Sequence, residues 1–466
     1  MNVNRFKNYD SDVKEAVLAF EQNQDEGGHR YFDEDDMEMV IDYYLETNDL
    51  HMLESSVDYA ASLFPDSNEI ALRRSHLLCA RQQYAEALQI LTRLENVEPN
   101  NCDVLYALGA VYSAMEQPRR AIEYYERATS DGYDLATIYG NIGEEYAKLG
   151  ISDRAIDCFK KSVQLNPDEE RSLDCLGALY EEENRTDDAI AFFQNFVKEH
   201  PYSRMAWFCL GAAYYSQQMW EKAIDQFEYA IAIDGKFVDP YIGVSDCYRA
   251  LHRPVEAVSA LRETLPLVED KSIVFSNIAS IYHDANNLDA AIIYYKKAVD
   301  EAPYFAEYWA KAASCFLDLG DRSSAMDFVD RAVHLSPQSP YCVSLAAYIH
   351  SQCGDDDNAI PLYDRALQLN LDDEGLWIEY ADLLMRLSRY DDAIQLLQDG
   401  LTHCQQAYFF YVRLAVCYYK TGRRNFLNNA LMACAQYKDT YGDDMLFILC
   451  PEMQNDIGVM NTLSTN

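Results

Sequence analysis

The sequence has little positive charge. It contains 38 Lys and Arg residues against 77 Asp and Glu residues, a net charge of −39 over 466 residues. Proteins that bind nucleic acid neutralise its phosphates with a basic track, so this composition argues against a nucleic-acid ligand. The same charge would repel an anionic membrane surface, and it leaves basic or neutral proteins as the expected partners.

Long apolar runs are also missing. No stretch approaches the roughly 20 apolar residues of a membrane-spanning helix. The first residues, MNVNRFKNYDSDVKEAV, are polar, so no signal peptide is predicted. The 13 Cys residues form no C-x-x-C pair, and an odd number of scattered thiols fits a reducing compartment better than a disulfide framework. We therefore expect a cytoplasmic protein.

The motifs of common enzymes do not occur. There is no H-E-x-x-H sequence, Walker loop, G-x-S-x-G sequence or dinucleotide fingerprint. Carboxylate pairs such as Glu144 and Glu145 are typical of solvated helix faces. The nine His residues have no common spacing. We therefore predict no catalytic residue, no metal site, no cofactor and no enzymatic activity.

What the sequence does contain is a pattern of two short helices in residues 136–169. Gly150 separates them as a left-handed residue that ends a helix, and Ser152 or Asp153 is expected to cap the second helix. Each helix has an apolar stripe at helical spacing. The first stripe contains Tyr139, Ile142, Gly143 and Tyr146, and the second contains Ala155, Ile156, Phe159, Val163 and Leu165.

This 34-residue pattern repeats without a change of phase. With Ala136 as place 1, twelve consecutive units fit residues 34–441. Place 11 is mostly aromatic, and place 20 is Ala in ten units, which allows close approach of two helices. Place 15 holds Gly or Asn in seven units, which suits a left-handed turn. A pair of short helices is marginal alone in water, so the units are expected to stack on one another.

The spacing and residue set resemble the tetratricopeptide repeat. The match is fullest at Trp207, Leu210, Gly211, Tyr214, Ala223, Phe227 and Ala230. The pattern departs at Arg74, Ser75 and His350 and in both end units. The resemblance implies an all-α fold, a right-handed superhelical α-solenoid of antiparallel helix pairs. It further implies a concave groove lined by the first helices, which holds proteins or peptides and does not catalyse.

Three segments follow from the repeat register. Residues 1–33 are predicted to form a capping helix and an acidic loop, residues 34–441 the twelve repeats, and residues 442–466 an apolar capping helix and tail. Place 8 is Gly in repeats three to six and Ala in repeats eight to twelve, with Ser245 between them. Residues 238–271 are therefore interpreted as a looser junction; simple sequence drift is the alternative.

The densest acidic run is Asp33, Glu34, Asp35 and Asp36. Acidic side chains are favourable in the first turn of a helix, and this is the simpler interpretation. The alternative is a docking patch for a basic partner.

The binding groove is predicted from places 2, 5, 9, 12 and 13 of the first helices. Small residues at place 9 leave space, and aromatic neighbours supply contact area. The candidate residues are Tyr106, Asp174, Glu181, Phe208, Tyr215, Asp246, Arg249, His283 and Tyr348. The alternative is that these aromatic side chains only pack on adjacent helices. The paired Lys and Asn with which some family members grip a terminal carboxylate are not evident.

The C-terminal segment contains six consecutive apolar residues from Met445 to Cys450. They could be covered by the tail, or Met445, Phe447 and Ile448 could form a self-association surface that makes a homodimer. Two functions therefore remain: a scaffold or adaptor that binds a protein segment in its groove, and a structural subunit that self-associates through its C-terminal end.

Overall fold

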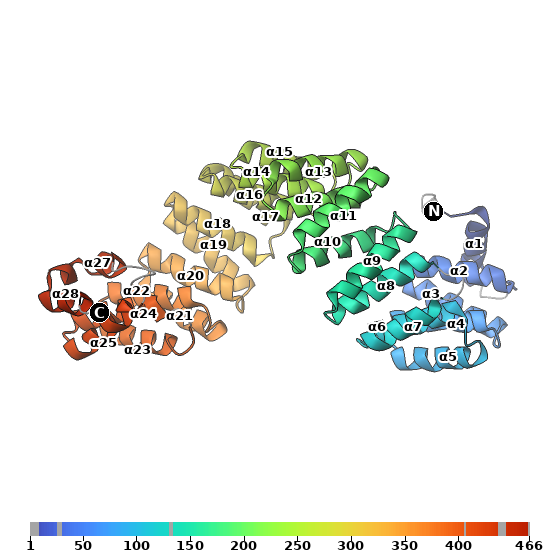
Figure 1. Ribbon diagram of the computed structural model, residues 1–466, viewed down its shortest axis with the longest axis horizontal. Coiled ribbons are helices and arrows are strands. Elements are labelled where there is room, and N and C mark those ends of the chain that lie inside the picture. The colour runs from blue at the N-terminus through green and yellow to red at the C-terminus, as the bar shows by residue number, and fades with distance from the viewer. Residues whose placement is uncertain (1–8, 26–29, 130–133, 405–406, 437–443, 465–466) are drawn as a thin grey trace. The chain divides into compact units, whose positions relative to one another are not determined.

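The computed structural model describes residues 9–25, 30–129, 134–404, 407–436 and 444–464. All regular elements in these residues are helices (Figure 1), which confirms the predicted all-α solenoid of helix pairs. The chain divides into two compact units, residues 1–243 and 244–466. Gly442 and Asp443, where the C-terminal segment was predicted to begin, lie outside the described residues, as do residues 1–8 and 26–29.

The helices of the first unit follow one another with short connections. They are α1 (Ser11–Asp25), α2 (Glu34–Glu46), α3 (Leu50–Leu63), α4 (Asn68–Ala80), α5 (Tyr84–Val97), α6 (Cys102–Ala114), α7 (Pro118–Ala128), α8 (Leu135–Lys148), α9 (Ser152–Leu165), α10 (Glu170–Glu182), α11 (Thr186–Glu199), α12 (Arg204–Ser216) and α13 (Trp220–Ile233).

The boundary between the units falls within α14 (Asp239–Ala250). The second unit continues with α15 (Pro254–Thr264), α16 (Ser272–Asp284), α17 (Leu288–Glu301), α18 (Ala306–Leu319), α19 (Arg322–Leu335), α20 (Pro340–Cys353), α21 (Asp356–Leu369), α22 (Glu374–Arg386), α23 (Tyr390–Gly400), α24 (Ala407–Lys420), α25 (Arg424–Ala435), α27 (Asp444–Leu449), a 3-10 turn (Pro451–Asn455) and α28 (Ile457–Ser464). The looser junction at residues 238–271 stays a prediction.

The helix boundaries follow the 34-residue register. The first helix of each repeat begins within one residue of place 1, and the second helix of each repeat begins at place 17. Within each unit the two helices of a repeat pack together, as α8 does with α9 and α18 with α19. The first helices of neighbouring repeats also contact each other, for example α10 with α12 and α20 with α22.

The turn between the two helices has the same backbone conformation in every repeat. Place 15 is left-handed throughout: it is Gly at Gly150, Gly320, Gly354 and Gly422, and otherwise Asn48, Gln82, Glu116, Asn184, Gln218, His252, Asn286 or Ser388. The turn is closed by backbone hydrogen bonds such as Ile151 N–H to the Tyr146 carbonyl, 3.0 Å. The left-handed glycines were predicted, whereas the sequence did not indicate the same conformation at Gln218 or Ser388.

One expected helix cap is wrong. Ser152 and Asp153 do not cap α9, because Ser152 is already its first residue and the N-cap position belongs to Ile151. A turn closed directly after Gly150 leaves only one residue before the helix starts. The hydroxyl of Ser152 instead donates a hydrogen bond to Glu183 of the next repeat. Leu165, assigned to the apolar stripe, is 49 % exposed because it lies in the last turn of α9.

Close packing within a repeat depends on small residues. Ala155 and Ala223 at place 20 are fully buried. At place 8, a methyl group on Gly211 would lie 2.6 Å from ring carbon Cδ1 of Phe227. The aromatic ring of the second helix therefore rests on the backbone of the first. Three cysteines at place 10, Cys247, Cys315 and Cys417, are also buried, and burial raises the pKa of each thiol.

Both ends of the chain are covered in part by their own segments. In α1, Ala16, Val17 and Phe20 are buried in a cluster with residues of α2 and α3. At the other end, Val459 and Leu463 of α28 are buried in one cluster with Leu427 and Leu431 of α25. The tail therefore covers part of the apolar surface of the last repeat.

Candidate functional site

A stripe of four residues on α10 forms one wall of a groove in the first unit. Asp174, Gly177, Ala178 and Glu181 are spaced three, four and seven residues from the first, so they lie on one face of the helix. The two carboxylates occupy the ends of this stripe, and the small residues between them leave the backbone accessible.

The opposite wall comes from α12, the first helix of the next repeat. Phe208, Ala212 and Ser216 occur every four residues and face the α10 stripe. The second helix α11 closes the floor with Ala189 and Phe193. The groove holds about 160 Å³ of free space. Pockets for small-molecule ligands are usually about 300–1,000 Å³, so a groove of this size suits side chains of a bound chain.

Phe208 is held in place by other aromatic rings. Its ring centroid lies 5.7 Å from that of Phe227 and 5.3 Å from that of Phe237. The guanidinium of Arg204 lies over the ring of Phe237, 5.1 Å from its centroid. These contacts leave Phe208 half-buried, with one side facing the groove. One part of the Phe208 ring therefore packs on adjacent aromatic rings, as the alternative interpretation expects, while the rest of the ring is accessible from the groove.

The groove carries uncompensated negative charge. Among the described residues, the side chains of Asp174 and Glu181 have no ion pair and no hydrogen bond. Burial by the surrounding walls raises the pKa of Asp174, and the charge of Asp239 acts in the same direction. Arg204 does not neutralise these groups, because it pairs with Glu170, with nitrogen–oxygen distances of 2.7 Å for both of its bonds.

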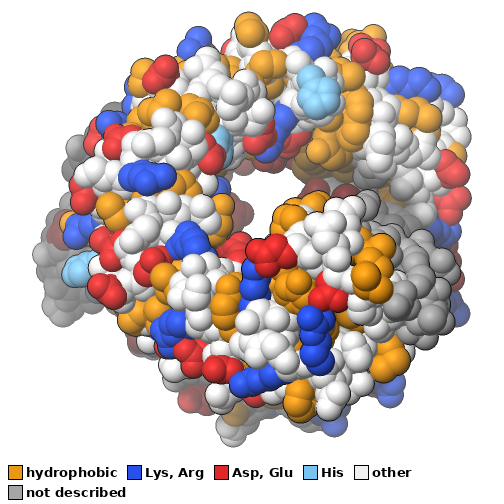
Figure 2. Space-filling view, turned by 90° about the vertical axis from the view of Figure 1, so that its left-hand side faces the viewer, with side chains coloured by type: hydrophobic (Ala, Val, Ile, Leu, Met, Phe, Trp, Pro, Cys, Tyr) orange, Lys and Arg blue, Asp and Glu red, His pale blue; other side chains and the backbone are white. Residues whose placement is uncertain are grey.

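Elsewhere the charges are mixed. Figure 2 shows Lys and Arg side chains among Asp and Glu side chains on the face that it presents. Several Arg side chains of the chain bridge consecutive repeats, as Arg413 does with both carboxylate oxygens of Asp382 at 2.7 Å. The negative groove between α10 and α12 differs from these neutralised surfaces.

The other two aromatic candidates of the first unit lie outside this groove. Tyr106 on α6 packs against Tyr125, with ring centroids 5.5 Å apart, and its hydroxyl accepts a hydrogen bond of 3.0 Å from Asn141 Nδ2. Tyr215 on α12 is 37 % exposed and contacts the ring of Trp220 at 4.9 Å. The structure thus brings Asp174, Glu181 and Phe208 together and leaves Tyr106 and Tyr215 on neighbouring surfaces.

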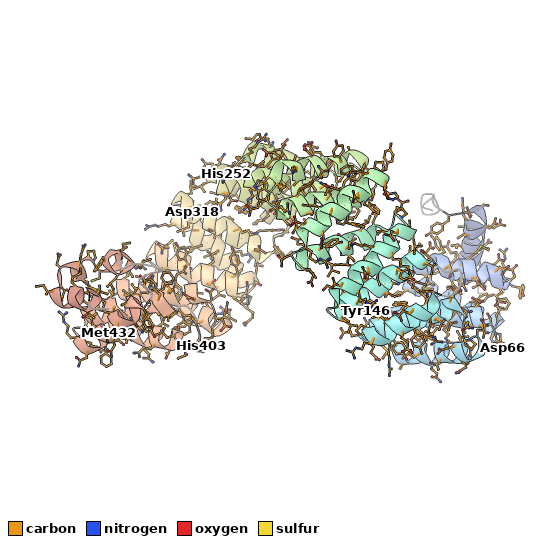
Figure 3. The ribbon with its side chains drawn as sticks, viewed as in Figure 1. Asp66, Tyr146, His252, Asp318, His403 and Met432 are labelled. Carbon is orange, nitrogen blue, oxygen red and sulfur yellow. The ribbon has the colours of Figure 1, made fainter. Side chains whose placement is uncertain are left out.

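In the second unit, two candidate residues contact a carboxylate of the next repeat. Arg249 Nε lies 2.6 Å from Asp284 Oδ2, and His283 Nε2 lies 2.7 Å from Asp318 Oδ2. Each pair joins place 12 of one first helix to place 13 of the next. Figure 3 shows Asp318 on α18. These contacts favour a role for Arg249 and His283 in holding successive repeats together.

The remaining candidates of the second unit are Asp246 and Tyr348. Asp246 on α14 is half-buried, and burial raises its pKa while Arg249 opposes the shift. Tyr348 on α20 lines a pocket of about 220 Å³ together with Glu379 and Arg386 of α22. Arg386 donates hydrogen bonds to Asp356 and to the Ser351 carbonyl, so this pocket contains a cation that the groove of the first unit lacks.

The acidic run lies where the simpler interpretation put it. Asp33 is the N-cap of α2 and accepts a 2.8 Å hydrogen bond from the Asp36 backbone N–H, and Glu34, Asp35 and Asp36 form the first turn. Burial and the nearby charge of Asp33 raise the pKa of Asp36. A docking role for this patch stays a prediction.

At the C-terminal end, the three candidate residues differ in exposure. Met445 and Phe447 are partly buried against the core of the second unit, whereas Ile448 is 71 % exposed. Ile457 at the start of α28 is 77 % exposed, and Met432 on α25 (Figure 3) is also exposed. The end of the second unit therefore presents separate apolar side chains to solvent.

Sequence reasoning missed the groove residues that come from second helices. Thr186, Ala189 and Phe193 belong to α11, whereas all the places predicted to line the groove lie on first helices. Ser216 stands at place 13, one of the predicted lining places, so this residue could have been selected. In the described part of the chain, no group of three or more His, Cys, Asp and Glu side chains is arranged to hold a metal ion. The helices described here also include none with the length and apolar content to span a bilayer.

Comparison with known proteins agrees with the repeat architecture. Family models for the tetratricopeptide repeat match residues 104–134, 136–169, 176–203, 205–237, 274–305 and 354–409. A search of curated proteins found no match.

Several solved structures resemble parts of the chain. A thermophilic TPR protein of Thermus thermophilus is 21 % identical over 39 % of this chain and 99 % of its own, with a TM-score of 0.32. A tetratricopeptide repeat protein from Parabacteroides merdae is 19 % identical over 50 % of this chain and 93 % of its own, with a TM-score of 0.37. The MamA protein is 27 % identical over 38 % of this chain and 96 % of its own, with a TM-score of 0.32.

Proposed function

The chain belongs to the tetratricopeptide repeat proteins, and from this premise we propose that it is a non-catalytic scaffold that binds a protein segment in its groove. Proteins of this kind generally hold other proteins or peptides. The observation that carries the proposal is the open groove between α10 and α12, in which Phe208 offers a fixed aromatic surface beside Asp174 and Glu181.

The proposed partners are neutral to basic proteins, because the chain has a net charge of −39 and the groove has two unpaired carboxylates. A cytoplasmic location belongs to the same proposal. The 13 free thiols support it, since reducing compartments keep such groups unpaired.

Affinity capture from native lysate tests the groove. The variant with both Phe208→Ala and Tyr215→Ala removes one aromatic side chain from the groove wall and one from the neighbouring surface of α12, and we expect it to lose the captured partners. A matched control replaces Tyr202 and Tyr304, which are 85 % and 84 % exposed at places outside the groove. If the folded groove variant retains its partners as fully as the control, the binding site is elsewhere.

A second candidate function is self-association through the C-terminal end. The exposed apolar side chains Ile448, Ile457 and Met460 of the C-terminal segment support it, because exposed apolar surface often marks an interface. Sedimentation of the pure chain should then show a dimer, and replacing Ile448 and Ile457 with Asp should return a monomer. A monomer at high concentration of the unmodified chain would reject this candidate.

A further inference from the structure

The two groove carboxylates are separated by a defined distance. Asp174 and Glu181 lie on the same face of α10, seven residues apart, which corresponds to about 10 Å along the helix axis. Their side chains stand at the two ends of the groove, and among the described residues neither has an ion pair or hydrogen bond.

The surface between the carboxylates is apolar. Gly177, Ala178 and Ala212 contribute little more than backbone and methyl groups, and Phe193 and Cys209 lie behind them. A side chain that fits such a surface has an aliphatic part to bury and a positive group at its end. Lys and Arg have this construction, because their methylene stems pack on apolar surface while the charged group stays near water.

None of the described residues that line this groove is a cation. Arg204 at the start of α12 is paired with Glu170 and Asp234, and Arg171 at the start of α10 is paired with Glu144. A further negative charge lies nearby, since the carboxylate of Asp239 repels that of Asp174. A bound cation would relieve this repulsion without displacing an existing ion pair.

We propose that the groove between α10 and α12 binds an extended segment of a partner protein that carries two basic side chains three residues apart. One basic group pairs with Asp174 and the other with Glu181, and their stems lie on Ala178, Ala212 and Phe208. This inference rests on the proposed function of the groove and identifies the chemistry of its occupant.

The spacing follows from backbone geometry. In a polyproline II segment, residues three apart lie on the same face, and the rise of about 3.1 Å per residue separates them by about 9 Å. This is close to the separation of the two carboxylates. In a β-strand, side chains on one face are two residues apart and separated by about 7 Å, a poorer match.

Binding of short peptides to the full-length chain tests the proposal. The probe has the sequence Gly-Pro-Lys-Pro-Pro-Lys-Pro-Gly with a neutral dye, and fluorescence anisotropy measures its dissociation constant. The comparison peptides replace both Lys residues with Gln or with Glu. We expect the Lys peptide to bind at least tenfold more tightly than the Gln peptide, and the Glu peptide to bind more weakly still.

Variants of α10 separate the groove from the overall charge. Asp174→Asn and Glu181→Gln should each weaken binding of the Lys peptide about fivefold or more. Glu182→Gln changes the net charge equally but stands next to Glu181 outside the groove lining, and it should leave binding unchanged. Ala178→Arg places a cation between the two carboxylates, at helical spacing from both, and should abolish binding while the helical content stays constant.

The outcomes distinguish the inference from the proposed function. Equal binding of the Lys and Gln peptides, with both lost in Phe208→Ala, would keep the groove as a binding site and overturn its basic preference. An equal effect of Glu182→Gln and Glu181→Gln would overturn the specific pairing. Absence of binding for all three peptides would overturn the inference. Binding that is unchanged in both Phe208→Ala and Ala178→Arg would also overturn it, and this second result would count against the proposed groove as well.

Discussion

Nδ1 of the buried His350 lies 2.8 Å from Oδ2 of Asp355, the residue that precedes α21. On its other side, Nε2 lies 3.0 Å from Oδ1 of Asp330. Both imidazole nitrogens of His350 therefore lie within hydrogen-bond distance of a carboxylate. His350 occupies place 11, where most other repeats have an aromatic residue, so in this repeat polar contacts to two carboxylates replace aromatic packing.

Removing this imidazole should destabilise the second unit. His350→Ala takes away two hydrogen bonds made by a buried side chain, and we expect a loss of about 1–3 kcal/mol in the free energy of unfolding. His283→Ala is the matched control, because His283 also faces an Asp but is 27 % exposed; it should cost less than about 1 kcal/mol. Denaturant unfolding measures both, and equal losses would contradict the importance of burial.

The contribution of Asp355 should depend on pH. Hydrogen bonds from Asn358 and His350 hold the pKa of Asp355 below its usual value. A depressed folded-state pKa stabilises the fold above the unfolded pKa of about 4, and this contribution disappears as the pH falls through the folded-state pKa. Asp355→Asn should therefore be less stable than the unmodified chain at pH 7 and equal to it in strong acid. A stability difference that persists unchanged below both pKa values would contradict this account.

Replacing a left-handed turn residue with glycine should stabilise the fold. Ser388 and Gln218 adopt φ values of 60° and 58°, which are unfavourable for residues with a side chain. Replacing either with Gly should raise stability by about 0.5–1 kcal/mol, after the greater freedom of Gly in the unfolded chain is subtracted. The reverse change, Gly320→Ala, should lower stability by about 1 kcal/mol through backbone strain alone, since a methyl group there meets no atom within 4 Å. Thermal unfolding measures all three variants.

Gly211 should not tolerate a methyl group. Gly211→Ala would place Cβ 2.6 Å from the ring of Phe227, and we expect a loss of about 1–3 kcal/mol from overpacking. Adding Phe227→Leu makes room for the methyl group, so the double variant should lose less than the sum of the two single changes. Additive losses in unfolding experiments would show that the ring moves aside freely.

Removing the charge of Asp174 should stabilise the fold. Its raised pKa means that the ionised carboxylate is less favourable in the folded chain than in the unfolded chain. This penalty is complete above the folded-state pKa and is lost as the pH falls from there to the unfolded-state pKa of about 4. Asp174→Asn should thus raise the thermal midpoint at pH 7 and have little effect in acid. A lower midpoint at pH 7 would show that the carboxylate supports the structure.

The helix pairs could be predicted because their signals are local. The 34-residue spacing located the start of α8 and of α10, and Gly150 indicated the turn between α8 and α9. Contacts between repeats could not be read in this way. The pairing of Arg249 with Asp284 joins residues 35 positions apart, and it depends on how two first helices stack.

The groove was predicted only in part, because some of its lining depends on how helices pack. Places 5 and 12 of the first helices identified Asp174, Glu181 and Phe208, whereas the contribution of Thr186 depends on the angle at which α11 packs beneath them. That Tyr106 contacts Tyr125 rather than the groove also follows from side-chain directions in the folded repeat, which a periodic pattern does not specify.

The shared left-handed turn has a mechanical consequence. Every helix pair is joined at place 15 by the same backbone conformation, and each pair is anchored chiefly by its immediate neighbours. A molecule pulled from its two termini should therefore yield pair by pair, and each event should release about 110 Å of contour length. Extension in such regular steps would let the chain absorb a load gradually instead of rupturing at once.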